Sequence, residues 1–187
     1  MVSPAPKVIS DGTIGIWPFH ESDVPFLFEA VRESVSELSV WMSWCSPDYS
    51  VKESTEFVRS TPSAWEKGEH YSFVVFQVST GRFLGGTGFN FINHLHNFAN
   101  LGYWVRTSAT RCGVASRAVR LVARFGIEDL KFSRLEIVAA VGNVASQRVA
   151  EKAGARREGV LSKRLQLHGQ SQDAVMFSLT AGDLTAC

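Results

Sequence analysis

The chain has 187 residues, of which 45% are hydrophobic and 20% are charged, and its formal net charge at pH 7 is +1. This length fits one domain with a buried core, and the balance of apolar and charged residues excludes a disordered or fibrous protein. A net charge so close to zero gives no overall field that would favour nucleic acid or an anionic membrane as a partner.

The first ten residues, MVSPAPKVIS, carry no signal peptide, and no later run is long and apolar enough to span a membrane. The three cysteines, Cys45, Cys112 and Cys187, are odd in number and far apart. We therefore expect a cytoplasmic protein with reduced thiols. The thirteen Phe and five Trp predict aromatic-lined pockets as well as a large core.

The first elements are a strand and two helices. TIGIWPF at 13–19 has the apolar, β-branched composition of a strand. Residues 22–39 predict a helix, with Asp23 and Pro25 tolerated in its first turn. A second helix is expected over 51–66, broken or offset by Pro62.

Residues 70–105 contain no helix signal and predict a three-stranded antiparallel meander. HYSFVVFQV ends at the turn STGR, FLGGTGFNFI ends at the polar stretch NHLHN, and FANLGYWV follows. GGTG at 85–88 resembles a phosphate loop, but it lies within a strand, where glycine more often marks a bulge or close packing.

The period of the apolar residues then changes to that of a helix. One face of this helix is apolar and carries Val114, Ala118, Leu121, Val122 and Phe125, while Arg117, Arg120 and Arg124 predict a solvated face. RLEIVAAV at 134–141 predicts a strand. NVASQRVAEKAG predicts a helix with Asn143 as N-cap and Gly154 just past its end, and DAVMFSLT predicts a last strand. The order indicates a single α/β domain around a mixed sheet, with flexible ends at 1–12 and 182–187.

The segment TRCGVAS at 110–116 places small residues where the helix begins. The first turn of a helix has backbone N–H groups without intrahelical partners, and the helix dipole favours an anion there. Gly113 and Ala115 would let a diphosphate approach these donors, with Arg111 beside them and Arg106 or Arg117 within reach. The alternative, left equally open by this segment alone, is that the small residues only allow the helix to pack tightly on the sheet.

Other segments join this one in a pattern. The loop Thr110-Arg111-Cys112-Gly113-Val114-Ala115 follows the strand end Gly102-Tyr103-Trp104-Val105. Asn143-Val144-Ala145-Ser146 opens the next helix, which ends in VAEKAG, and GQSQD precedes the last strand. WMSW stands early, at 41–44. Together these segments resemble the GNAT superfamily of acetyl-CoA-dependent N-acetyltransferases, and within it the RimJ/RimL group that acetylates protein N-termini, including those of ribosomal proteins. The superfamily's loop has the form [QR]-x-x-G-x-[GA], so Thr110 departs from it at the first position.

The resemblance implies a mostly antiparallel central sheet of about seven strands flanked by helices, with a V-shaped splay between the fourth and fifth strands. It implies acetyl-CoA as the cofactor and an amine acceptor, most simply a protein N-terminus, as the partner, and it leaves a homodimer open. The residues that it implies for the coenzyme are Tyr103, Trp104, Val105, Arg106, Arg111, Cys112, Gly113, Val114, Ala115, Ser116, Asn143 and Ser146. No metal is implied.

The chemistry needs an oriented neutral amine, a proton acceptor, and donors for the oxyanion and for the departing thiolate. By resemblance, a backbone N–H near Trp104 or Val105 serves the oxyanion, and Ser146 is the catalytic proton donor. An ordinary helix-end hydrogen bond is an equally open interpretation of Ser146.

The base is left unassigned because no spacing selects one residue. An N-terminal amine has a pKa near ~8, so water and a weak acceptor would suffice. The candidates are Glu53, Glu69, His70, His94 and His96. Some members of the resembling group have a catalytic Glu in the segment after the N-x-x-S helix, and the corresponding segment here, KRLQLHG, offers Gln166 and His168 but no carboxylate.

Two further patterns are discounted. His94 and His96 alternate like metal ligands but have no evident third ligand, so a polar hairpin tip is favoured. Cys112 lies where a thiol pKa is lowered, but it has no base partner for nucleophilic catalysis.

Two other functions remain open. One is acetylation of a small amine, such as a polyamine, amino sugar or antibiotic. The other is a non-catalytic acyl-CoA-binding module, which the missing carboxylate and Thr110 keep open.

Overall fold

The computed structural model describes residues 8–184, and its centre is an eight-stranded open sheet with the order β1-β2-β3-β4-β5-β6-β8-β7. The strands are β1 (Ile9–Ser10), β2 (Ile14–Pro18), β3 (Tyr71–Gln77), β4 (Phe83–Asn93), β5 (Phe98–Val105), β6 (Arg134–Ala140), β7 (Arg156–Leu167) and β8 (Gln170–Leu179). All neighbours are antiparallel except β5 and β6, which are parallel. The predicted mixed sheet is confirmed, with the two-residue β1 and the long β7 added to the strands that the sequence indicated.

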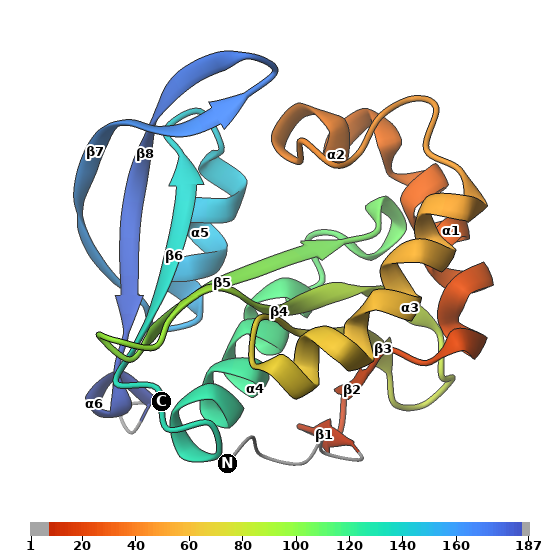
Figure 1. Cartoon of the computed structure of the whole chain (residues 1–187), viewed down its shortest axis with the longest axis horizontal. Coiled ribbons are helices and arrows are strands. Elements are labelled where there is room, and N and C mark those ends of the chain that lie inside the picture. The colour runs from red at the N-terminus through yellow and green to blue at the C-terminus, as the bar shows by residue number, and fades with distance from the viewer. Residues whose placement is uncertain (1–7, 185–187) are drawn as a thin grey trace.

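Helices cover both faces of this sheet (Figure 1). They are α1 (Val24–Glu33), α2 (Val35–Trp41), α3 (Val51–Lys67), α4 (Val114–Glu128), α5 (Val144–Lys152) and α6 (Ala181–Leu184). Alternation along β3 shows the two layers: Phe73 and Val75 pack in the core that holds α4 and α5, and Val74 and Phe76 in the core under α1 and α3. None of the described helices is long and apolar enough to cross a membrane.

The helix predicted over 22–39 is in fact two helices, because the chain breaks at Ser34. The Ser34 hydroxyl donates to the Ala30 carbonyl oxygen at 2.8 Å and accepts from the Thr107 N–H at 2.9 Å. The helix is interrupted at this buried serine, and the serine hydroxyl contacts the segment after β5.

The break predicted at Pro62 is wrong, since α3 continues through it. Proline cannot donate to the carbonyl four residues earlier. Here the Thr61 hydroxyl donates to that oxygen, on Val58, at 2.9 Å. The orphaned acceptor is therefore satisfied and the helix survives.

The prediction of flexible ends falls partly outside the described residues, at 1–7 and 185–187. Of the remainder, Ile9 and Ser10 pair with β2, and residues 181–184 form α6. Regular structure therefore extends further toward both ends than the sequence suggested.

Candidate active site

The sheet separates between β5 and β6, as the resemblance implied. Without the two-residue β1, these are the fourth and fifth strands in chain order. β5 pairs with β4 as far as Val105, but it pairs with β6 only from Phe98 to Asn100. Beyond Asn100 no described strand pairs with the second edge of β5. The β7–β8 hairpin and α2 lie at the same end of the molecule, on opposite sides of this separation (Figure 1).

The register of β5 shows which peptide groups face the separation. The N–H of Arg106 donates to the Leu84 carbonyl of β4 at 2.8 Å. Because peptide groups alternate in direction along a strand, the N–H of Trp104 also points toward β4, whereas those of Tyr103 and Val105 point toward β6. Of the two oxyanion donors expected from the sequence, the geometry favours Val105.

The N-terminus of α4 is open. Gly113 occupies the N-cap with φ of +76°, and no side chain of the described residues caps this end. A Cβ at Gly113 would have no atom within 4 Å, so this glycine does not serve tight packing. It is needed for the left-handed backbone, and the first-turn N–H groups of Val114 to Ser116 have no side-chain cap among the described residues.

The basic residues near α4 differ in what they bind. The Arg106 side chain is buried and donates to Glu33, to Glu29 and to the Phe83 carbonyl, and this contact lowers the pKa of Glu33 to about 2. Arg117 pairs with Asp11 at 2.8 Å. The guanidinium of Arg106, expected at the coenzyme, instead holds α1 against the end of β5, and the exposed Arg111 is the basic side chain left beside the loop.

Asn143 and Ser146 open α5 on the β6 side of the separation. Asn143 Oδ1 accepts from the Ser146 N–H at 3.0 Å, which confirms the predicted N-cap. The Ser146 hydroxyl makes no such helix-end bond. Its Oγ lies 3.0 Å from the phenolic oxygen of Tyr103, which also donates to the Ser146 carbonyl oxygen at 2.9 Å. Burial raises the pKa of Tyr103 to about 12. No pattern in the sequence signals this side-chain contact.

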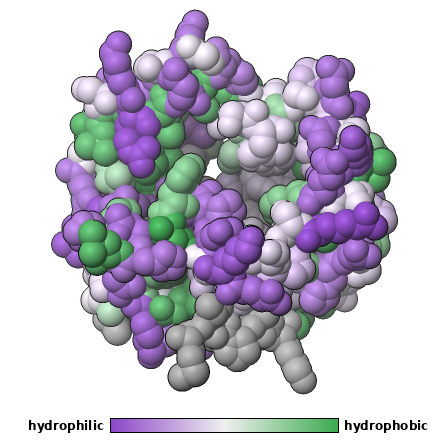
Figure 2. Space-filling model, viewed as in Figure 1, coloured by the Kyte–Doolittle hydropathy of each residue, from purple (hydrophilic) through white to green (hydrophobic). Residues whose placement is uncertain are grey.

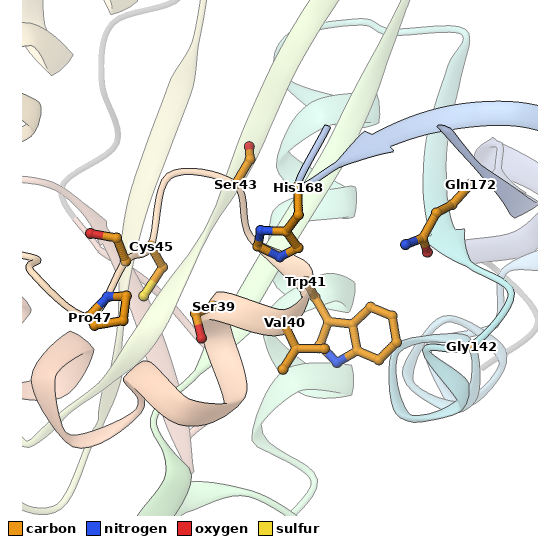
Figure 3. A pocket seen from close by; sticks show the side chains of 10 residues that line it. Ser39, Val40, Trp41, Ser43, Cys45, Pro47, Gly142, His168 and Gln172 are labelled. Atoms are coloured by element: carbon orange, nitrogen blue, oxygen red, sulfur yellow. The ribbon is translucent and has the colours of Figure 1, made fainter. Parts of the chain in front are cut away.

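A cavity of about 640 Å³ lies at the wide end of the separation. It is lined by α2 and the loop after it, by the turn after β6, and by the β7–β8 hairpin, through Ser39, Val40, Trp41, Ser43, Cys45, Ser46, Pro47, Gly142, His168 and Gln172. In Figure 3 the His168 side chain comes from the β7–β8 hairpin, whereas Trp41 and Ser43 come from α2 and the loop after it. A Cβ on Gly142 would lie 3.4 Å from the Trp41 ring, so the cavity reaches the residue before Asn143.

Trp41 lines this cavity, and Trp44 packs against Trp104 with ring centroids 6.1 Å apart. Among the candidate bases, His168 lines the cavity, whereas Glu53 accepts from the Ser50 N–H at the start of α3.

Burial raises the pKa of the Cys45 thiol, and Cys112 is exposed; Cys187 lies outside the described residues. The three serines of the cavity had no pattern in the sequence that could have identified them.

The surface is hollowed where these elements meet (Figure 2). The hollow separates the side formed by β7, β8 and α5 from the side formed by α2. A substrate can therefore approach the separation between the β7–β8 hairpin and α2.

Comparison with known proteins gives consistent findings. The family model described as an acetyltransferase (GNAT) domain matches residues 14–156. The probable N-acetyltransferase YjcK of Bacillus subtilis is 29% identical over 136 residues, which are 72% of this chain and 75% of that protein. The ribosomal-protein-serine acetyltransferase of Escherichia coli is 23% identical over 158 residues, 84% and 87% of the two chains. The structure of Mycobacterium smegmatis RimJ in complex with CoA-disulfide superposes with a TM-score of 0.84 at 22% identity and covers 96% of this chain and 88% of that one.

Proposed function

Because this chain belongs to the GNAT acetyltransferase family, whose members use acetyl-CoA, we propose that it acetylates the α-amino group at the N-terminus of a protein. Its activity class is that of an acyltransferase acting on amines. The acceptor is the part of the proposal that goes beyond the family, and ribosomal proteins are the first candidates because a curated relative carries that activity in its name.

The residues present fit the coenzyme at two places. The uncapped N–H groups of Val114, Ala115 and Ser116, with Arg111 beside them, suit its diphosphate. The unpaired edge of β5 after Asn100 offers peptide groups to the amide-containing arm. Thr110 and Cys112 complete the loop, and by resemblance Asn143 would contact the arm.

Bound acetyl-CoA supplies an acyl group that is already activated as a thioester. The chain's own residues then orient the amine and stabilise the oxyanion and the departing thiolate. In this proposal the N–H of Val105 would donate to the oxyanion, and the hydroxyl of Ser146, from the other side of the separation, would donate to the leaving sulfur.

The lining of the cavity is the observation that carries the choice of acceptor. It contains serines, His168 and Gln172 but no Asp, Glu, Lys or Arg. A polyamine carries several cations, which carboxylates in the binding site would stabilise. A single amine on an otherwise uncharged chain end needs none, and a cavity of about 640 Å³ can admit it.

The test is mass spectrometry of acceptors incubated with enzyme and acetyl-CoA. The panel contains peptides with a free N-terminus, the same peptides with a blocked N-terminus and an internal lysine, and small polyamines and amino sugars. We expect acetylation of the free N-termini alone. Modification of polyamines in preference to peptides would contradict the proposed acceptor, and coenzyme binding without transfer to any amine would contradict the enzyme activity.

A further inference from the structure

The Tyr103 side chain connects the two walls of the active site. It projects from β5, in the part that no longer pairs with β6, and its hydroxyl contacts Ser146 at the start of α5. The N–H of Ser146 donates to Oδ1 of Asn143, which lies in the same wall as Ser146. The serine hydroxyl is therefore fixed in direction by a residue from the opposite wall.

Counting protons gives two arrangements of this pair. The phenol has one proton, so when it donates to the Ser146 carbonyl it can only accept from Ser146 Oγ. In that arrangement the serine proton points at Tyr103. If the phenolic proton rotates onto Ser146 Oγ, the serine proton is freed for an acceptor in the separation between β5 and β6.

We propose that Tyr103 is a positioning residue for the transfer reaction, which aims the Ser146 hydroxyl and replaces the proton that Ser146 gives to the departing sulfur. The inference rests on the proposed function. When the carbon–sulfur bond breaks, its electron pair goes to sulfur, sulfur takes the Ser146 proton, and Ser146 takes the phenolic proton. Water then returns a proton to the phenolate, and the proton lost by the amine goes to solvent.

Acid strength supports this order of transfer. A phenol is a stronger acid than an aliphatic alcohol, so the negative charge ends on Tyr103 rather than on Ser146. Burial raises the pKa of Tyr103 to about 12, so the phenol still carries its proton at neutral pH.

The test uses Tyr103→Phe, which removes the hydroxyl and keeps the ring. We expect kcat to fall about 10- to 100-fold, with the dissociation constant of acetyl-CoA changed less than about twofold. Tyr49→Phe is the matched control, because Tyr49 accepts from the buried Ser54 hydroxyl at 2.9 Å in a similar tyrosine–serine pair. It should leave kcat unchanged.

Two readouts separate proton supply from a merely structural bridge. An acetyl thioester of a more acidic thiol needs less protonation on leaving, so the ratio of wild-type to Tyr103→Phe rates should fall toward one with that donor. In a double-mutant cycle, adding Ser146→Ala to Tyr103→Phe should cost little beyond the larger single loss.

Unchanged kcat in Tyr103→Phe, equal losses with both donors, or additive losses in the cycle would each overturn this inference alone. Absence of transfer by the wild-type protein to every amine would overturn both the inference and the proposed function. Failure of the inference is thus seen in the variants, whereas failure of the proposed function is seen in the wild-type protein.

Discussion

Gly113 links backbone conformation to the proposed binding of the coenzyme. A side chain at φ of +76° costs roughly 1 kcal/mol, and relief of this strain would turn the first-turn N–H groups of α4 away from their common direction. We expect Gly113→Ala to weaken acetyl-CoA about tenfold, measured by isothermal titration calorimetry.

Gly81 provides the matched control for this substitution. It lies in the β3–β4 turn with φ of +70°, and a Cβ there would also meet no atom within 4 Å. Gly81→Ala should therefore lose a similar stability and no affinity. Equal affinities in the two variants would show that the α4 loop does not hold the coenzyme.

His168 tests the acceptor side of the site. It is exposed at the β7–β8 turn and lines the cavity. His168→Ala should raise the KM for a peptide acceptor about tenfold, because it removes a polar wall of the cavity, and should leave the affinity for acetyl-CoA unchanged. His96→Ala, in the β4–β5 turn, is the control in steady-state kinetics, and the same effect in both variants would exclude a specific role for His168.

Among the elements, α1 is attached to the end of β5 through one buried arginine. Arg106 donates to Glu33, and that hydrogen bond lowers the pKa of Glu33 from 4.5 to about 2. A carboxyl whose pKa is lower in the folded protein stabilises it above pH 4.5, and this stabilisation is lost as the pH falls toward 2.

We therefore expect Glu33→Gln to lower the free energy of unfolding at pH 7 by about 1–2 kcal/mol, since the carboxylate is partly exposed. The difference from wild type should shrink between pH 4.5 and pH 2.5, as measured by urea unfolding. Glu56→Gln, which removes an exposed pair with Lys52 at 3.7 Å, should show almost no loss at either pH. A Glu33 effect that does not change with pH would contradict the ionic origin.

Elements with a strong local period were predictable from the sequence, and those decided by distant contacts were not. The apolar face of α4 and the Asn143 cap are local, and both are confirmed. The continuity of α3 at Pro62 depends on a hydroxyl that takes over a carbonyl, and the break at Ser34 depends on Thr107, 73 residues away. The charge of Arg106 suggested a side chain within reach of the diphosphate, whereas its buried guanidinium pairs with carboxylates of α1.

The same limit applies to the candidate site. The loop at 110–116 and the N-x-x-S element were visible as short patterns. The Tyr103–Ser146 contact spans 43 residues and the cavity combines three separate segments, so neither has a local signature. The sequence therefore offers candidate residues for the coenzyme side of the site and few for the acceptor side.

At the scale of the molecule, the two parts of the sheet share only the short β5–β6 pairing, and the proposed coenzyme site has contributions from both. A ligand that binds only the folded chain stabilises it by about 2.7 kcal/mol at a concentration of 100 times Kd. For a protein of this size each kcal/mol raises the thermal midpoint by about 2–4 °C. We expect acetyl-CoA at that concentration to raise the midpoint by about 5–11 °C in scanning calorimetry.

If Gly113→Ala weakens binding tenfold, the same concentration should give about half that rise, whereas Gly81→Ala should show the full rise from its own lower midpoint. A rise that is equal in both variants would place the coenzyme away from α4, and no rise in the wild-type protein would mean that the folded chain does not bind it.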